Sequence, residues 1–210
     1  MFTRLLGLFI AAVIVAPLPA NATSIAASFS LPQTPYSGNN LADGVDGFSF
    51  APTEAIRVTE LGWYDQGGDG LLHAHQVGIF DSTSQALLAT VTVNSASVLG
   101  ASNFRFAALL TALDLVAGQS YIVAGFGNGP NYDPYLDVVS GGVTYGAEIG
   151  FQAYRYAFST SLVYPALIGG ANPLFGANFR YETTAVPEPA SLALAGLALG
   201  LGALMRRRRA

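Results

Sequence analysis

Four side chains able to ligate a metal lie close together in the chain: Asp65, Asp69, His73 and His75. Alternate residues of a strand face the same side, so His73 and His75 have the spacing that two imidazole ligands of one metal need. The Asp-x-Gly-Gly-Asp-Gly segment offers oxygen ligands to calcium, but it lacks the full D-x-[DN]-x-[DN]-G pattern and its distant Glu. We therefore favour a Gly-rich hairpin turn over a metal site, with both histidines at the entrance of a strand, on the face shared by Val77 and Ile79.

Aromatic and acidic residues form a second candidate site. They are Tyr132, Asp133, Tyr135 and Asp137 in one loop, beside Trp63 and Tyr64. Flat rings can pack against sugar faces while carboxylates bind hydroxyl groups, as in carbohydrate-binding modules. The alternative, which we favour, is that these rings fill the core or the edge of a β-domain.

No pattern for catalysis accompanies these residues. A serine-type hydrolase needs a nucleophile beside a base, yet the chain has two histidines, no cysteine and no G-x-S-x-G. A glycosidase needs two carboxylates across a sugar cleft, and most acidic residues here, such as Asp43, Asp46, Asp69 and Asp81, lie in segments typical of turns. We therefore predict a protein that is not an enzyme and has no catalytic residue, metal or cofactor.

The elements that must position these residues have the periodicity of strands. In the run 87–93 the residues alternate between two faces. Leu87, Ala89, Val91 and Val93 face a core, and Leu88, Thr90 and Thr92 face away from it. Similar runs lie at 56–64, 75–80, 104–109, 121–126, 154–158 and 175–181. Turn segments separate them, among them Asp43-Gly44, Asp46-Gly47, Gly67–Gly70 and Gly169-Gly170. Many short strands without helical patterns predict an all-β fold, an antiparallel β-sandwich.

The composition of residues 23–185 limits the partners of this body. Its length suits one domain. The chain has no cysteine, which excludes disulfides, and no lysine. Of the 13 acidic residues all but Glu188 lie in the body, whose basic residues are Arg57, Arg105, Arg155 and Arg180. So acidic a surface argues against nucleic acid or an anionic membrane as a partner of the body.

The first 22 residues predict a signal peptide. Arg4 supplies the positive region, Leu5–Ala16 the apolar region, and Ala20-Asn21-Ala22 a cleavage pattern of the A-x-A type. The apolar region is too short for a stable membrane span. We therefore expect export through the inner membrane and a mature chain that begins at Thr23.

The last 25 residues, 186–210, combine three features. Prolines keep Val186-Pro187-Glu188-Pro189 in an extended conformation. An uncharged segment follows from Ala190 to Met205, and it is followed by Arg206, Arg207, Arg208 and Arg209. At about 1.5 Å per residue the uncharged segment forms a transmembrane helix of only ~24 Å, short of the ~30 Å hydrocarbon core. The positive-inside rule places the arginines in the cytoplasm. This order of features favours a transient anchor.

The tail resembles the PEP-CTERM sorting signal of Gram-negative, biofilm-forming bacteria, which an exosortase reads. The resemblance implies that an exosortase releases the chain from the inner membrane and that the protein reaches the cell surface or the extracellular matrix. Segments of residues 48–126, including Glu60-Leu61-Gly62-Trp63-Tyr64 and Phe104-Arg105-Phe106, resemble an extracellular β-domain of unknown function that often precedes such tails. That resemblance implies a fibronectin-like or jelly-roll-like sandwich and brings no activity with it.

These observations predict a structural or adhesive role in biofilm or exopolysaccharide. The partners we expect are the exosortase, the inner membrane before processing, and extracellular polysaccharide, but no nucleic acid. A carbohydrate-binding module is the alternative, and a polysaccharide hydrolase is the weaker one.

Overall fold

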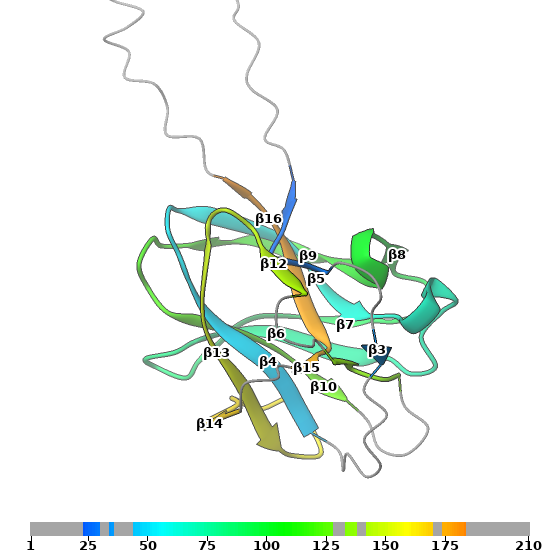
Figure 1. Ribbon diagram of the computed structural model, residues 1–210. Coiled ribbons are helices and arrows are strands. Elements are labelled where there is room, and N and C mark those ends of the chain that lie inside the picture. Colours follow the sequence, from blue (N-terminus) through cyan, green and yellow to red (C-terminus); the bar gives the residue numbers. More distant parts are fainter. Residues whose placement is uncertain are drawn as a thin grey trace, which may run out of the picture.

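Antiparallel strands dominate the described part of the chain (Figure 1). The computed structural model describes residues 23–29, 34–35, 44–127, 133–137, 142–169 and 174–183. The first sheet has the order β1 (Ser24–Ile25), β16 (Ala177–Thr183), β5 (Ile56–Tyr64), β9 (Phe104–Leu115) and β8 (Val98–Leu99). The second has the order β14 (Leu167–Ile168), β13 (Ile149–Phe158), β4 (Gly44–Pro52), β10 (Tyr121–Gly127), β6 (His75–Asp81) and β7 (Leu87–Val93). The predicted all-β, antiparallel class is confirmed.

Shorter elements complete the described part. One small sheet has the order β15 (Leu174–Phe175), β11 (Leu136–Asp137) and β3 (Thr34–Pro35), and another pairs β12 (Val143–Tyr145) with β2 (Ala27–Phe29). Two 3₁₀ turns are η1 (Gln66–Gly68) and η2 (Ala101–Asn103). A search of the described residues for an apolar helix of membrane-spanning length finds none.

The main core lies between the two large sheets. Phe48 and Phe50 of β4 contact Phe179 of β16, and Trp63 of β5 stacks on His75 of β6. Burial of several large rings between sheets is the main source of stability for a domain without disulfides.

A second apolar cluster lies on the opposite face of the six-stranded sheet. Val45, Phe80, Ile122 and Ala124 are buried there against Leu162 and Tyr164, which follow β13. Because this segment covers the outer face, β4, β6 and β10 are buried at consecutive positions rather than at alternate ones. The predicted turns at Asp43-Gly44 and Asp46-Gly47 are wrong from Gly44 onward, since residues 44–52 form β4.

The register predicted for residues 87–93 is correct in part. Val93 is buried, Val91 packs against the main core, and Thr92 is exposed, as expected. Leu87 was expected on the same face as Val91 but is 45% exposed. The pairing of β6 with β7 shifts between Ile79 and Phe80, and this bulge reverses the side on which Leu87 lies.

The described chain enters and leaves the domain at neighbouring positions. Ser24 pairs with Tyr181 and Ile25 with Arg180, so β1 and the last strand, β16, lie side by side (Figure 1). The predicted signal peptide, with Ala20 and Ala22, lies outside the described residues. The same holds for the tail, with Val186, Pro187, Glu188, Pro189 and the arginines 206–209, and for its predicted helix.

Candidate functional site, a polar cleft at the end of β5

The loop after β5 is shaped by glycines and by Asp65. Gly67 and Gly68 have φ values of 81° and 72°, a conformation that glycine adopts without strain. The carboxylate of Asp65 accepts the backbone N–H of Gly70 at 3.1 Å and the guanidinium Nε of Arg105 at 2.6 Å. The loop joins strands of different sheets, so the predicted Gly-rich turn is a crossover between the sheets and not a hairpin.

Arg105 is a partner that the sequence analysis missed. It extends from β9 and also donates to the backbone carbonyl oxygens of Ser95 and Ser97, each at 3.0 Å. It thus ties the loop of Asp65 to the loop before β8. The sequence offered a hint, since alternation places Arg105 on the face of its strand opposite to Phe104 and Phe106.

His75 begins β6 and is fully buried. Its Nε2 lies 2.8 Å from a carboxylate oxygen of Asp133, and its Nδ1 lies 3.1 Å from the carbonyl oxygen of Phe126. The ring stacks on Trp63 with 4.2 Å between centroids and 8° between planes. A neutral imidazole has one N–H, so in that form the ring donates to one of these two oxygen atoms.

Asp133 is held from three directions. Besides His75 it accepts the backbone N–H groups of Leu72 at 2.8 Å and His73 at 3.0 Å. Burial alone raises the pKa of this carboxyl, but the hydrogen bonds from His75, Leu72 and His73 outweigh burial and place its pKa below the usual range. The anion of Asp133 is therefore stabilised inside the protein.

The two histidines do not share a face, so that prediction is wrong. His73 lies exposed in a bend before β6, whereas His75 is buried on the face of Val77 and Ile79, as expected. The reason is that β6 begins at His75, as the run 75–80 predicts, so His73 precedes the strand and the alternation of faces does not extend to it. Among the described residues, no group of three or more His, Asp or Glu side chains is arranged to hold a metal ion.

The aromatic candidates are mostly internal. Tyr135 is buried and meets Trp63 edge to face, with 5.5 Å between ring centroids. Asp133 is engaged as described above, and Tyr132 lies outside the described residues. The geometry of Tyr135 supports the interpretation that this ring fills the core.

A second buried carboxylate, Asp46, was assigned to a turn and instead lies within β4. It accepts a hydrogen bond from the hydroxyl of Tyr154 on β13, and the hydroxyl of Tyr135 also contributes. Burial raises the pKa of Asp46, and the two hydroxyls offset only part of that rise. No signal in the sequence pairs these residues, because they are joined by strand pairing alone.

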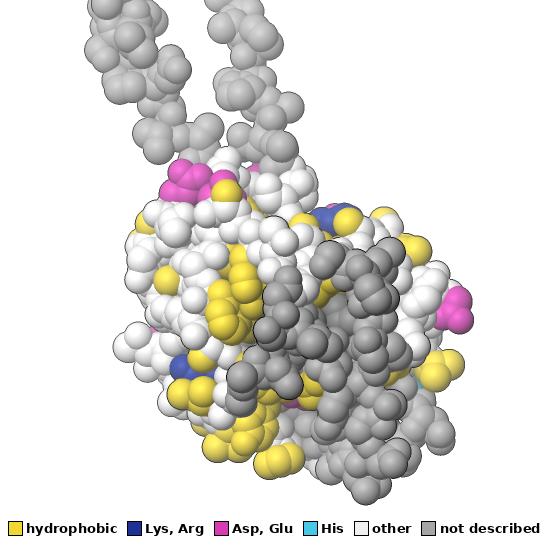
Figure 2. Space-filling model, in the orientation of Figure 1, with side chains coloured by type: hydrophobic (Ala, Val, Ile, Leu, Met, Phe, Trp, Pro, Cys, Tyr) yellow, Lys and Arg dark blue, Asp and Glu magenta, His cyan; other side chains and the backbone are white. Residues whose placement is uncertain are grey.

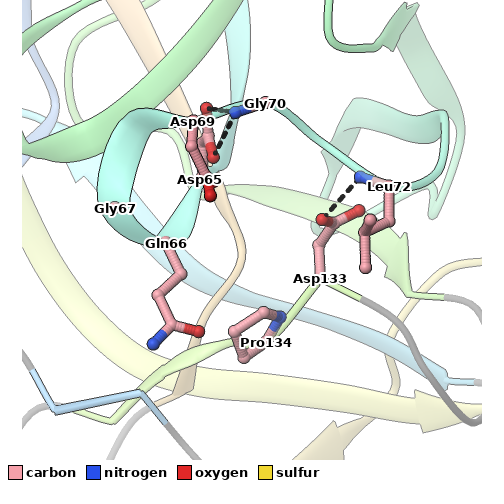
Figure 3. A pocket seen from close by; sticks show the side chains of 8 residues that line it. All are labelled: Asp65, Gln66, Gly67, Asp69, Gly70, Leu72, Asp133 and Pro134. Atoms are coloured by element: carbon pink, nitrogen blue, oxygen red, sulfur yellow. Dashed lines mark hydrogen bonds between the residues drawn. The ribbon is translucent and has the colours of Figure 1, made fainter.

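A cleft of about 580 Å³ lies between the loop of Asp65 and Asp133 (Figure 3). Figure 3 shows the loop of η1 on one side and Asp133 with Pro134 on the other. The lining residues are Asp65, Gln66, Gly67, Asp69, Gly70, Leu72, Asp133 and Pro134. The structure thus brings Asp65, Asp69 and Asp133 to one place, whereas His75 lies behind Asp133. The chemistry available is hydrogen bonding by carboxylate and amide groups beside the apolar surfaces of Leu72 and Pro134.

The cleft lies at the end of the domain far from the chain ends. Thr183 of β16 pairs with Ile56 at the start of β5, while the cleft follows the other end of β5.

A separate feature is an apolar area of the surface. Hydrophobic side chains gather in the lower part of the face shown in Figure 2. Exposed apolar residues along the pair of β13 and β14 include Phe158, Leu167 and Ile168.

Comparison with known families adds a result for the tail. A family model described as the PEP-CTERM protein-sorting motif matches residues 185–209. The chain carries a PEP-CTERM sorting motif. This motif implies an exported protein that is processed by an exosortase. A search of curated proteins found no match for the chain.

Proposed function

We propose that the protein is a non-enzymatic component of the cell surface or the extracellular matrix, with a structural or adhesive role in biofilm. The observation that carries this proposal is the PEP-CTERM motif at residues 185–209, because it directs the body out of the cell. Residues 186–210 act as a transient anchor in the inner membrane until the exosortase releases the body. The body, residues 23–185, is one β-sandwich domain of fibronectin-like or jelly-roll-like type.

The arrangement of the chain ends supports presentation of the domain away from the membrane. β1 and β16 leave the domain side by side, and β16 ends at Thr183, directly before the motif. A tail inserted in the membrane therefore holds this end of the domain nearest to the bilayer. The cleft after β5 then points outward, where partners of the surface or matrix are met.

The surroundings of His75 support a role without catalysis. Its dyad with Asp133 resembles the base of a hydrolase in composition, but the ring is fully buried and both of its nitrogen atoms face protein acceptors. A general base must reach a substrate proton directly or through one water. The buried pair of His75 and Asp133 instead stabilises the fold.

The cleft favours binding of neutral polysaccharide as a second candidate function. Its volume of about 580 Å³ lies within the range of small-ligand sites, and it combines fixed acceptors with the exposed Leu72. Gln66→Ala with Asp69→Ala should remove binding of neutral hexasaccharides, measured by calorimetry, because both side chains line the cleft and are exposed. Glu54→Ala, an exposed change on the loop after β4, is the matched control.

The sorting proposal is tested by changing the tail in cells. Pro187→Ala with Glu188→Ala should leave an uncut chain in the inner membrane, because the tripeptide is altered while the apolar segment from Leu192 to Met205 is unchanged. Replacement of the four arginines 206–209 with Ser should instead release part of the full-length chain, because the charges that retain the segment are lost. Antibody detection of the body in membrane and surface fractions separates these results. Normal trimming of the Pro187/Glu188 variant would show that the tail only anchors.

A further inference from the structure

The N-terminal segment 24–29 lies between β16 and β12 and pairs with both. The space that it occupies there is called the groove. β1 pairs with β16, and β2 pairs with β12. Between the two pairings, the N–H of Ala26 donates to the carbonyl oxygen of Phe179 at 2.9 Å, and the carbonyl oxygen of Ala26 accepts from Gly146 at 3.0 Å. The segment is thus bound along its backbone on both sides, as an added strand is bound at a sheet edge.

Asn178 of β16 recognises the backbone of this segment. Its amide oxygen accepts the N–H of Ala27 at 3.2 Å, and its amide nitrogen donates to the carbonyl oxygen of Ala27 at 2.7 Å. The amide oxygen also accepts the N–H of Phe179, so removal of the segment takes from the buried Asn178 the acceptor of its amide nitrogen. An empty groove therefore favours any extended peptide that restores these hydrogen bonds.

The segment itself is held less firmly than its neighbours. Ala26 and Ala27 are its only fully buried side chains, whereas β5 and β16 bury Trp63 and Phe179. Phe29 is half-buried and packs on Phe104 and Phe175, with centroids 5.5 Å and 5.0 Å apart. Burial of small side chains contributes little free energy, so this element opens more easily than the central strands.

We propose that the groove between β16 and β12 is a strand-acceptor site whose second occupant is the segment 24–29 of another copy of this chain. The segment provides the matching sequence, and in the mature chain expected to begin at Thr23 it is a free end that enters the groove without threading. Exchange of this strand links copies at the base of the tail. This exchange rests on the structural role proposed above, and it identifies a second copy of the chain as the partner.

Cysteine pairing provides a direct test, because the chain has no cysteine of its own. Ile25 and Arg180 are register partners, and opposed residues of antiparallel strands have Cα atoms about 4.5–5.5 Å apart, within reach of a disulfide. Mature chains with Ile25→Cys alone and with Arg180→Cys alone are mixed at high concentration, warmed toward the unfolding midpoint, cooled and oxidised. A disulfide-linked heterodimer is expected in several-fold excess over a mixture of Arg180→Cys with Thr92→Cys, an exposed position on β7.

The double variant Ile25→Cys/Arg180→Cys checks the geometry within one chain. It should form an internal disulfide, seen as faster migration on a non-reducing gel. If this disulfide forms while the mixed single variants link no more than the control, the segment stays in its own groove and the proposal is overturned. Failure of the internal disulfide in a folded double variant also overturns it. Neither result depends on sorting, and the tail variants leave the groove unchanged.

Discussion

Asp133 and Asp46 are two carboxylates with little exposed surface and with different surroundings. Their exposed fractions are 5% and 7%. Asp133, beside the entrance of β6, faces a histidine ring and two backbone N–H groups, and its pKa lies below the usual range. Burial raises the pKa of Asp46, in β4, and the tyrosine hydroxyls that it faces offset only part of that rise. Burial favours the neutral acid at Asp46, whereas the hydrogen-bond donors around Asp133 outweigh burial and favour its anion.

The contrast separates two kinds of buried acid in a domain of this type. Around Asp133 the anion organises the chain, because it fixes the backbone of Leu72 and His73 and orients His75 against Trp63. Around Asp46 the acid fills a polar position between β4 and β13 without requiring charge. We therefore expect the cleft to depend on Asp133 and to be insensitive to Asp46.

The largest expected effect is that of Asp133→Asn. The change keeps the shape of the side chain but removes the carboxylate that faces His75. It also places an amide nitrogen, which cannot accept, near the backbone N–H groups of Leu72 and His73. Removing one partner of a buried pair costs about 3–5 kcal/mol. Urea unfolding measures the loss. Asp114→Asn is the matched control, because its pair with Arg57 is exposed and screened by solvent, so its loss should change the urea midpoint little. A similar loss of unfolding free energy in both variants would mean that Asp133 contributes no more to stability than an exposed ion pair does.

Val91→Asp places a third carboxylate on the core side without donors. Val91 is half-buried against the main core, so the new acid should lower the free energy of unfolding by about 2 kcal/mol. Thr92→Asp, on the exposed side of the same strand, should change it by less than about 0.5 kcal/mol. Equal urea midpoints for the two variants would contradict the register of β7.

Strand periodicity predicted the all-β, antiparallel class but not which strands share a sheet. Val91, Val93 and Thr92 were placed correctly because local alternation decides the face of a strand. β4 was hidden by Asp46 and Gly47, since a strand covered on both faces and paired through a buried acid lacks that alternation. Asp65 and Asp69 were candidates by their spacing in one loop, but their approach to Asp133 depends on long-range pairing. The sorting motif at residues 185–209 could be recognised from the sequence because its residues are contiguous.

Asp46→Asn should have a smaller effect, about 1 kcal/mol, because an amide oxygen can still accept from Tyr154. Its pH dependence distinguishes it from Asp133. The raised pKa of Asp46 means that the folded protein holds a proton after the unfolded chain has released it, so stability from this group falls as pH rises through that window. The lowered pKa of Asp133 gives the reverse, stability that is present at neutral pH and lost as pH falls.

Urea midpoints at several pH values compare the two asparagine variants with the parent. The difference between the parent and Asp46→Asn should shrink as pH rises from about 4, the usual pKa of Asp, while the difference for Asp133→Asn should shrink as pH falls. Parallel pH profiles would remove the distinction between the two carboxylates.

The smallest expected effect is that of chelation. Asp65 and Asp133 are satisfied by Arg105, by His75 and by backbone N–H groups, so neither carboxylate needs a cation in order to be stable. Asp69 alone gives a metal too few ligands, because calcium takes six to eight oxygen atoms. EDTA should therefore leave the melting temperature of the body unchanged, and added calcium or zinc should not raise it. A fall of several degrees that calcium reverses would mean that a cation replaces protein donors at Asp65 or Asp133, and the contrast with Asp46 would then rest on metal binding instead of on His75.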